Sequence, residues 1–130
     1  MIVVDASALI EVLLQTERGQ IISETLLAAD ENLNAPHLID VEVSQVLRRY
    51  CLSDQMTSAR AREALQDLID FPIHRYPHDL FIERIWELRR SLTAYDAAYV
   101  ALSEALDARL ITCDGRIAAA SGHTARVAVY

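Results

Sequence analysis

The chain has 130 residues, 52% of them hydrophobic, with only three glycines and three prolines. This composition predicts one compact, helix-rich domain spanning residues 1–130 and argues against a disordered chain. The formal charge is −7 and all twelve basic residues are arginine, which argues against broad, non-specific nucleic-acid binding and excludes phosphate chemistries that need a lysine.

The two cysteines, Cys51 and Cys113, are too few for a disulfide framework and lack zinc-site spacing. We expect both to be free thiols in a reducing compartment. The sequence begins without a basic leader or an apolar stretch long enough to span a bilayer. We therefore expect a soluble cytoplasmic protein that does not associate with membranes.

In the first half of the chain, the β-branched run at 2–4 predicts a buried strand. A helix is expected at 8–14, with Asp5 or Ser7 near its N-cap. Residues 32–35 give a weak strand or a connection, and Pro36 suits the first turn of the helix that follows it. The helices expected in this half lie at 8–14, 18–29, 36–52 and 54–69.

The second half shows the same alternation of strands and helices. Strands are predicted at 73–76, 109–113 and 126–130, and helices at 79–91, 95–106 and 115–121. Strands separated by helices imply parallel pairing. The predicted fold class is therefore α/β, a three-layer α/β/α sandwich with a mainly parallel central sheet.

Two carboxylates come directly after predicted strands. Asp5 follows the first strand, and Asp114 follows the strand at 109–113. Ligands of open parallel sheets bind beyond the carboxyl ends of the strands, so both side chains would enter one crevice if these strands are neighbours. Taken alone, Asp5 also fits a helix cap, and Asp114 with Gly115 fits a turn.

Two further carboxylates lie on apolar helices. Glu42 stands one helical turn after Leu38 and one turn before Val46, where a carboxylate is costly unless it is paired. Asp96 stands near the start of an apolar helix, where Thr93 and Asp96 also fit a capping box. Glu42 would instead face solvent if the helix were rotated.

Four carboxylates at one site repel one another unless a cation lies between them. Oxygen ligands favour Mg²⁺ or Mn²⁺ over zinc, and such ions promote phosphodiester hydrolysis. The hydroxyls of Ser7 and Thr112 are candidates to orient water or a carboxylate, although capping and strand positions explain them equally well. The residues therefore predict a metal-dependent nuclease whose ligands and catalytic groups are Asp5, Glu42, Asp96 and Asp114.

Two arginine pairs are candidates to grip an RNA backbone: Arg48 with Arg49, and Arg89 with Arg90. Ordinary solvated helix surface is the alternative interpretation of these pairs. Metal chemistry alone does not select the sugar, so a nuclease acting on DNA stays open. A catalytically silent module, whose acidic pocket only receives an arginine from a partner, is the alternative from another class.

The segments 5–9, 42–49, 92–102 and 110–115 resemble the motifs of the PIN domain, and more narrowly those of VapC-type toxins from bacterial toxin–antitoxin pairs. The resemblance extends over essentially the whole chain and rests on the order, spacing and flanking residues of all four segments. One position departs from the pattern, because Gln45 stands where the family often has asparagine.

The resemblance implies a PIN-like fold and a Mg²⁺- or Mn²⁺-dependent endoribonuclease with an acidic quartet at Asp5, Glu42, Asp96 and Asp114. It also implies an inhibiting VapB-type antitoxin, which in the family often places an arginine in the acidic pocket. A homodimer is implied as well, and apolar helix faces such as those carrying Trp86 or Leu65 are candidates for its interface. A silent PIN module that binds an antitoxin-like partner remains the alternative.

Overall fold

Five strands form the centre of the protein, and the computed structural model describes residues 1–130. All neighbouring strands pair in parallel, in the order β3-β2-β1-β4-β5. The predicted parallel sheet is therefore confirmed. The strands are β1 (Ile2–Val4), β2 (Leu33–Pro36), β3 (Ile73–Tyr76), β4 (Arg109–Thr112) and β5 (Arg126–Val129).

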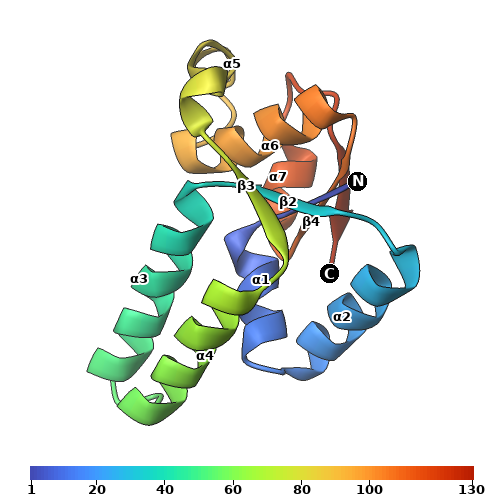
Figure 1. Ribbon diagram of the computed structural model, residues 1–130. Helices are drawn as coiled ribbons and strands as arrows, with labels where there is room; N and C mark the ends of the chain where they lie inside the picture. The colour runs from blue at the N-terminus through green and yellow to red at the C-terminus, as the bar shows by residue number, and fades with distance from the viewer.

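Helices complete the predicted three-layer arrangement. They are α1 (Ala6–Leu13), α2 (Glu17–Ala29), α3 (Leu38–Leu52), α4 (Ser58–Asp70), α5 (Ile82–Glu87), α6 (Ala94–Leu106) and α7 (Gly115–Ala119), with a 3₁₀ helix η1 (His78–Phe81). Figure 1 shows α1 to α4 gathered on one side of the sheet and α5 and α6 on the other. Helix α6 packs across β1, β2 and β4, whereas α1 contacts β4 and the helices α2, α3 and α4. None of these helices has the length and apolar character needed to span a bilayer.

Strand β1 lies in the middle of the sheet, and its three residues are completely buried because helices cover both faces. Val4 lies opposite Ile111 of β4. Directly after β1, the backbone N–H of Asp5 donates to the carbonyl oxygen of Ile111 at 3.1 Å. This register places the carboxyl ends of β1 and β4 side by side, where Asp5 and Asp114 follow them.

Two predicted boundaries were wrong around α3. Pro36 is not in the first turn of the helix but ends β2, opposite Tyr76 of β3. Strand β1 pairs only with Leu33 and Asn34, so the missing N–H of Pro36 leaves no gap on that side of the ladder. The helix predicted from Asp54 begins at Ser58, because Asp54 adopts a left-handed φ of 57° in the turn between α3 and α4.

The continuous helix predicted at 79–91 is also wrong. The segment divides into η1, α5 and a turn, and Phe81 at their junction has a non-helical φ of −113°. Beyond Glu87 the chain turns so that Leu88 and Leu92 enter the core, where they are 2% and 8% exposed. Burial of these two leucines favours the turn over further helix, which would have carried them along the α5 axis.

Helices α1 and α2 cross at a very short distance. A Cβ added to Gly19 would lie 1.9 Å from the carbonyl oxygen of Glu11. Thr16 caps α2 three residues earlier, because its hydroxyl accepts a 2.9 Å hydrogen bond from the N–H of Gly19. Gly19 is therefore the residue that lets α2 fold back onto α1.

Candidate active site

All four predicted acids line one cleft of about 640 Å³. Asp5 and Asp114 reach it from the ends of β1 and β4, Glu42 from the second turn of α3, and Asp96 from the first turn of α6. The arrangement follows from the sheet order, since β1 and β4 are neighbours and α6 packs across both. The roles of these acids as metal ligands and catalytic groups remain predictions.

Asp5 is the most buried of the four acids, at 5% exposed. Its Oδ1 accepts hydrogen bonds from the Ser7 hydroxyl at 2.7 Å and from the N–H of Ala8 at 3.0 Å, which caps α1. Its Oδ2 accepts from the Thr112 hydroxyl at 2.6 Å. Burial raises the pKa of Asp5, and these hydrogen bonds oppose that rise.

The two hydroxyls also connect the ends of β1 and β4. The oxygen of Ser7 accepts from the N–H of Cys113 at 2.9 Å, and that of Thr112 accepts from the N–H of Asp114 at 2.9 Å. Both residues therefore orient the Asp5 carboxylate and fix the backbone that carries Asp114. A helix-capping position alone does not account for the contacts of Ser7, and a strand position alone does not account for those of Thr112.

Glu42 and Asp96 are half-buried groups facing the same cleft. The Tyr99 hydroxyl donates a 2.7 Å hydrogen bond to Oε1 of Glu42. Burial raises the pKa of Glu42, and the Tyr99 bond opposes the rise. Burial likewise raises the pKa of Asp96, whose backbone N–H donates to the capping hydroxyl of Thr93 at 3.2 Å as the capping box predicts.

Asp114 differs from the other three acids because it is paired with a cation. Oδ2 of Asp114 lies 2.7 Å from Nη2 of Arg116, and Oδ1 lies 3.0 Å from Nε. The Arg116 guanidinium lowers the pKa of Asp114 below its usual value. Arg116 also lines the cleft, and sequence reasoning missed it. Its position two residues after a candidate ligand placed it near the site in the sequence but did not indicate an ion pair.

The acids influence one another electrostatically, as a shared site requires. The charge of Asp96 helps to raise the pKa values of Asp5 and Glu42, and the charge of Asp114 helps to raise that of Asp96. No three His, Cys, Asp or Glu side chains are arranged to hold one ion in this conformation. The donor set still fits a hard divalent cation, because it offers only oxygens and gathers like charges that a cation would neutralise.

The four arginines singled out in the sequence occupy different surroundings. Arg49 lines the acidic cleft, whereas Arg48, Arg89 and Arg90 are exposed residues that do not. The guanidinium of Arg89 lies 4.7 Å from the centre of the Trp86 ring, an arrangement typical of a cation–π contact. The cleft therefore has two arginines at its edge, Arg49 and Arg116.

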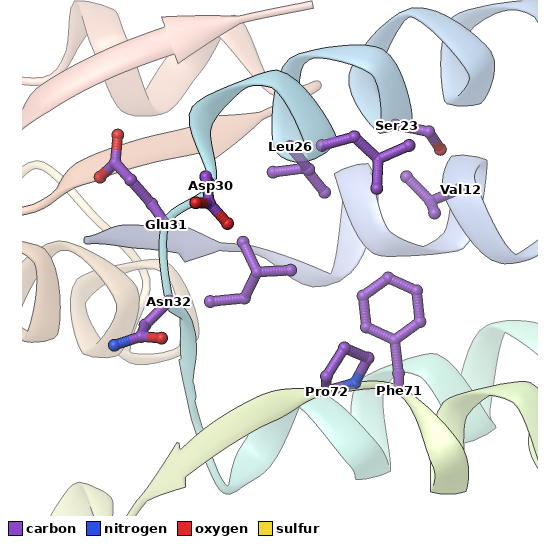
Figure 2. Close-up of a pocket in the computed structure, with 10 residues that line it drawn as sticks. Val12, Ser23, Leu26, Asp30, Glu31, Asn32, Phe71 and Pro72 are labelled. Atoms are coloured by element: carbon purple, nitrogen blue, oxygen red, sulfur yellow. The ribbon is translucent and has the colours of Figure 1, made fainter.

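A second hollow of about 520 Å³ lies between α1, α2 and the end of α4 (Figure 2). Its apolar floor includes Val12, Leu26 and Phe71. Figure 2 shows the Glu31 side chain pointing away from Phe71, and the Glu31 carboxylate pairs with the amino terminus of the chain. None of the predicted site residues lines this hollow, so the acidic cleft is the better candidate for chemistry.

Comparisons with known proteins agree on one family. A PIN domain model matches residues 2–122. Ribonuclease VapC1 of Mycobacterium tuberculosis is 46% identical over 121 residues, covering 92% of this chain and 90% of that protein. VapC ribonuclease Mb0985 of Mycobacterium bovis is 48% identical over 117 residues, covering 90% and 88%.

Solved structures with low sequence identity share the fold. VapC20 of Mycobacterium tuberculosis, described as a sarcin-ricin loop cleaving toxin, superposes with a TM-score of 0.69 at 17% identity, covering 95% of this chain and 97% of that one. VapBC2 of Rickettsia felis, bound to a DNA fragment from their promoter, gives a TM-score of 0.72 at 11% identity, covering 100% and 99%.

Proposed function

The chain belongs to the PIN domain family, and we propose that it is the toxin of a type II toxin–antitoxin pair and a metal-dependent endoribonuclease. The observation that carries the proposal is the meeting of Asp5, Glu42, Asp96 and Asp114 in one cleft. The identity of 46–48% to proteins named VapC ribonucleases supports RNA as the substrate class.

Asp5, Glu42, Asp96 and Asp114 are the residues that would hold Mg²⁺ or Mn²⁺. When bound, such an ion activates water and stabilises negative charge on the phosphate. The protein's own contribution is orientation. Ser7 and Thr112 fix both oxygens of Asp5, and Tyr99 fixes one oxygen of Glu42. These two carboxylates would therefore lose little conformational entropy on binding an ion.

The arginines offer contacts to the RNA backbone. Arg49 lies at the edge of the cleft, where its guanidinium can bind a phosphate next to the scissile bond. Arg48, Arg89 and Arg90 lie outside the cleft, so any contact they make is with RNA further along the strand. Local cationic groups and the metal are needed because the chain as a whole carries a charge of −7.

A VapB-type antitoxin is the proposed inhibitor, and the Rickettsia felis structure contains such a toxin with its antitoxin. Three of the cleft acids have pKa values raised by burial, so a cationic side chain from a partner would be favoured there in place of a metal ion. We also propose a homodimer. Trp86 is the better of the two candidate contacts, because it is 67% exposed whereas Leu65 packs against the core.

The test is cleavage of a panel of structured RNAs with Mg²⁺, with Mn²⁺ and with excess chelator. We expect cleavage only with metal, and none of DNA strands of the same sequences. Asp96→Asn should abolish it. Asp107→Asn is the matched control, since Asp107 ends the same helix with a left-handed φ of 48° that asparagine tolerates. Intact RNA throughout the panel, or equal cleavage by Asp96→Asn, would refute the proposal.

A further inference from the structure

Three N–H groups of Arg116 hold the carboxylate of Asp114, which leaves at most one acceptor position for another ligand. A carboxylate offers about four lone-pair sites. The backbone N–H of Arg116 donates to Oδ1 at 2.9 Å, and its Nε donates to Oδ1 at 3.0 Å. The same Nε lies 3.2 Å from Oδ2, and Nη2 donates to Oδ2 at 2.7 Å. Arg116 alone therefore satisfies both oxygens of this acid.

Glu42 and Asp5 differ from Asp114 in the charge of the groups that hold them. Glu42 accepts one hydrogen bond, from Tyr99 to Oε1. Asp5 accepts two bonds on Oδ1 and one on Oδ2. These partners are uncharged, so a cation that binds beside Glu42 or Asp5 has no positive group to displace. A cation that binds Asp114 has to displace the guanidinium of Arg116.

The Arg116 side chain is free to leave its partner. It is 87% exposed, whereas the Asp114 side chain is only 23% exposed. Rotating the guanidinium into solvent would uncover no apolar core, because Arg116 stands on the outer face of the first turn of α7. The backbone N–H of Arg116 would keep its bond to Oδ1, so Asp114 would still cap the helix.

We propose that Arg116 is a positioning residue that competes with the divalent cation for the carboxylate of Asp114. In the metal-free protein the guanidinium holds Asp114, and binding of the ion requires that this pair opens. The released guanidinium then remains at the cleft that Arg49 also lines, where it can bind the phosphate of an incoming strand. This inference rests on the proposed metal site and assigns Arg116 a role in setting its affinity.

The test is the affinity for Mn²⁺, measured on the whole protein without RNA by titration calorimetry and by the spin-resonance signal of free Mn²⁺. Arg116→Ala should bind Mn²⁺ about fivefold more tightly than the wild type, the upper range for the strength of an exposed ion pair. The Mn²⁺ affinity of Arg116→Lys should lie between those of the wild type and Arg116→Ala, because lysine keeps the charge but loses the bidentate geometry.

Two control variants separate competition from a general effect of charge. Arg49→Ala removes a positive charge from the same cleft, but Arg49 makes no ion pair with the four acids. Arg126→Ala breaks an exposed arginine pair elsewhere, with Asp107 at 3.2 Å. We expect both to change the Mn²⁺ affinity less than twofold, because neither arginine has to leave one of the four acids before the ion binds and salt weakens the effect of exposed charges.

Unchanged or weaker Mn²⁺ binding by Arg116→Ala, with intact binding by the wild type, would overturn this inference and leave the proposed function standing. Equal tightening by Arg49→Ala would also overturn it, because charge alone would then explain the effect. Absence of Mn²⁺ binding in the wild type would overturn the metal site itself. Should Arg116→Ala fold poorly, Arg116→Gln retains the stem of the side chain and decides the same question.

Discussion

The hydroxyl of Tyr99 donates a 2.7 Å hydrogen bond to Oε1 of Glu42, which joins α6 to α3 across the acidic cleft. Tyr99 is 1% exposed, so the position of its hydroxyl is fixed by the core around the ring. The bond favours the ionised form of Glu42 and opposes the rise in pKa that burial causes. A core residue thus holds a candidate metal ligand in place across the cleft.

Tyr99→Phe should raise the pKa of Glu42 further, because the only hydrogen bond opposing the effect of burial is removed. We expect the acid limb of the pH–rate profile to move to higher pH, since Glu42 must be ionised to bind a cation. The free energy of unfolding should fall by about 1 kcal/mol, typical of one lost hydrogen bond. An unmoved acid limb would show that this bond does not control Glu42.

Asp5→Asn should abolish cleavage while the fold is retained. Asparagine keeps an Oδ1 that can accept from Ala8, so the cap of α1 survives, but the negative charge needed by a metal ligand is lost. We expect cleavage to fall about 100-fold or more, as when a main electrostatic group is removed. Asp5→Ala is the companion variant and should also lower stability by about 1 kcal/mol through loss of the cap. Circular dichroism melting and RNA cleavage check both.

Asp96→Asn should stabilise the metal-free protein at neutral pH. The pKa of Asp96 is raised above 3.8 in the folded state, so the folded protein binds this proton more tightly than the unfolded chain. Wild-type stability therefore falls as pH rises through the range between 3.8 and the folded pKa, and the variant escapes this loss. The gain should be present at neutral pH and should vanish at low pH, where Asp96 is protonated in both states.

Urea unfolding of the wild type and Asp96→Asn at neutral and acidic pH measures this difference. Adding Mg²⁺ should raise the melting temperature of the wild type more than that of the variant, because the ion binds only the folded state. A variant less stable than the wild type at neutral pH without metal would contradict the electrostatic account.

Gly19→Ala should destabilise the protein strongly although glycine is normally a poor helix residue. The new Cβ would lie 1.9 Å from the Glu11 carbonyl oxygen, so α1 and α2 must separate. We expect a loss of about 1–3 kcal/mol, as for overpacking in a core. Ala28→Gly and Ala29→Gly are the controls, because they exchange alanine for glycine in the same helix at positions away from the contact with Glu11. A neutral or stabilising Gly19→Ala would mean that the two helices adjust freely.

Trp86→Glu should convert the proposed dimer to monomers. Trp86 shares the η1 and α5 surface with two other exposed apolar side chains, Leu80 and Ile82. Leu27→Glu is the matched control, since Leu27 is 81% exposed on α2, away from that surface. Sedimentation velocity at micromolar concentration checks the change. A wild type that is already monomeric, or a dimer that survives Trp86→Glu, would remove this surface from the interface.

Most strands and the four site acids could be predicted from the sequence because each has a local signal, whereas residues 32–35 gave only a weak indication of β2. Short β-branched runs marked strands such as β1, and acids that follow strands or interrupt apolar helix faces marked the cleft. The pairing of Arg116 with Asp114 was not readable, because it depends on a side-chain rotation within one turn. The contact between Tyr99 and Glu42 spans 57 positions and depends on how α6 and α3 pack. The turn after Glu87 likewise accompanies burial of Leu88 and Leu92 in the core, which helical periodicity does not reveal.

We expect a divalent cation to bind between the carboxylates of the acidic cleft. Crystals soaked in Mn²⁺, with diffraction recorded on both sides of its absorption edge, would locate such an ion. We predict an anomalous peak in the cleft within coordination distance of oxygens from Asp5 and Asp96. A cleft without such a peak, while Mn²⁺ binds at other surfaces of the same crystal, would contradict the account.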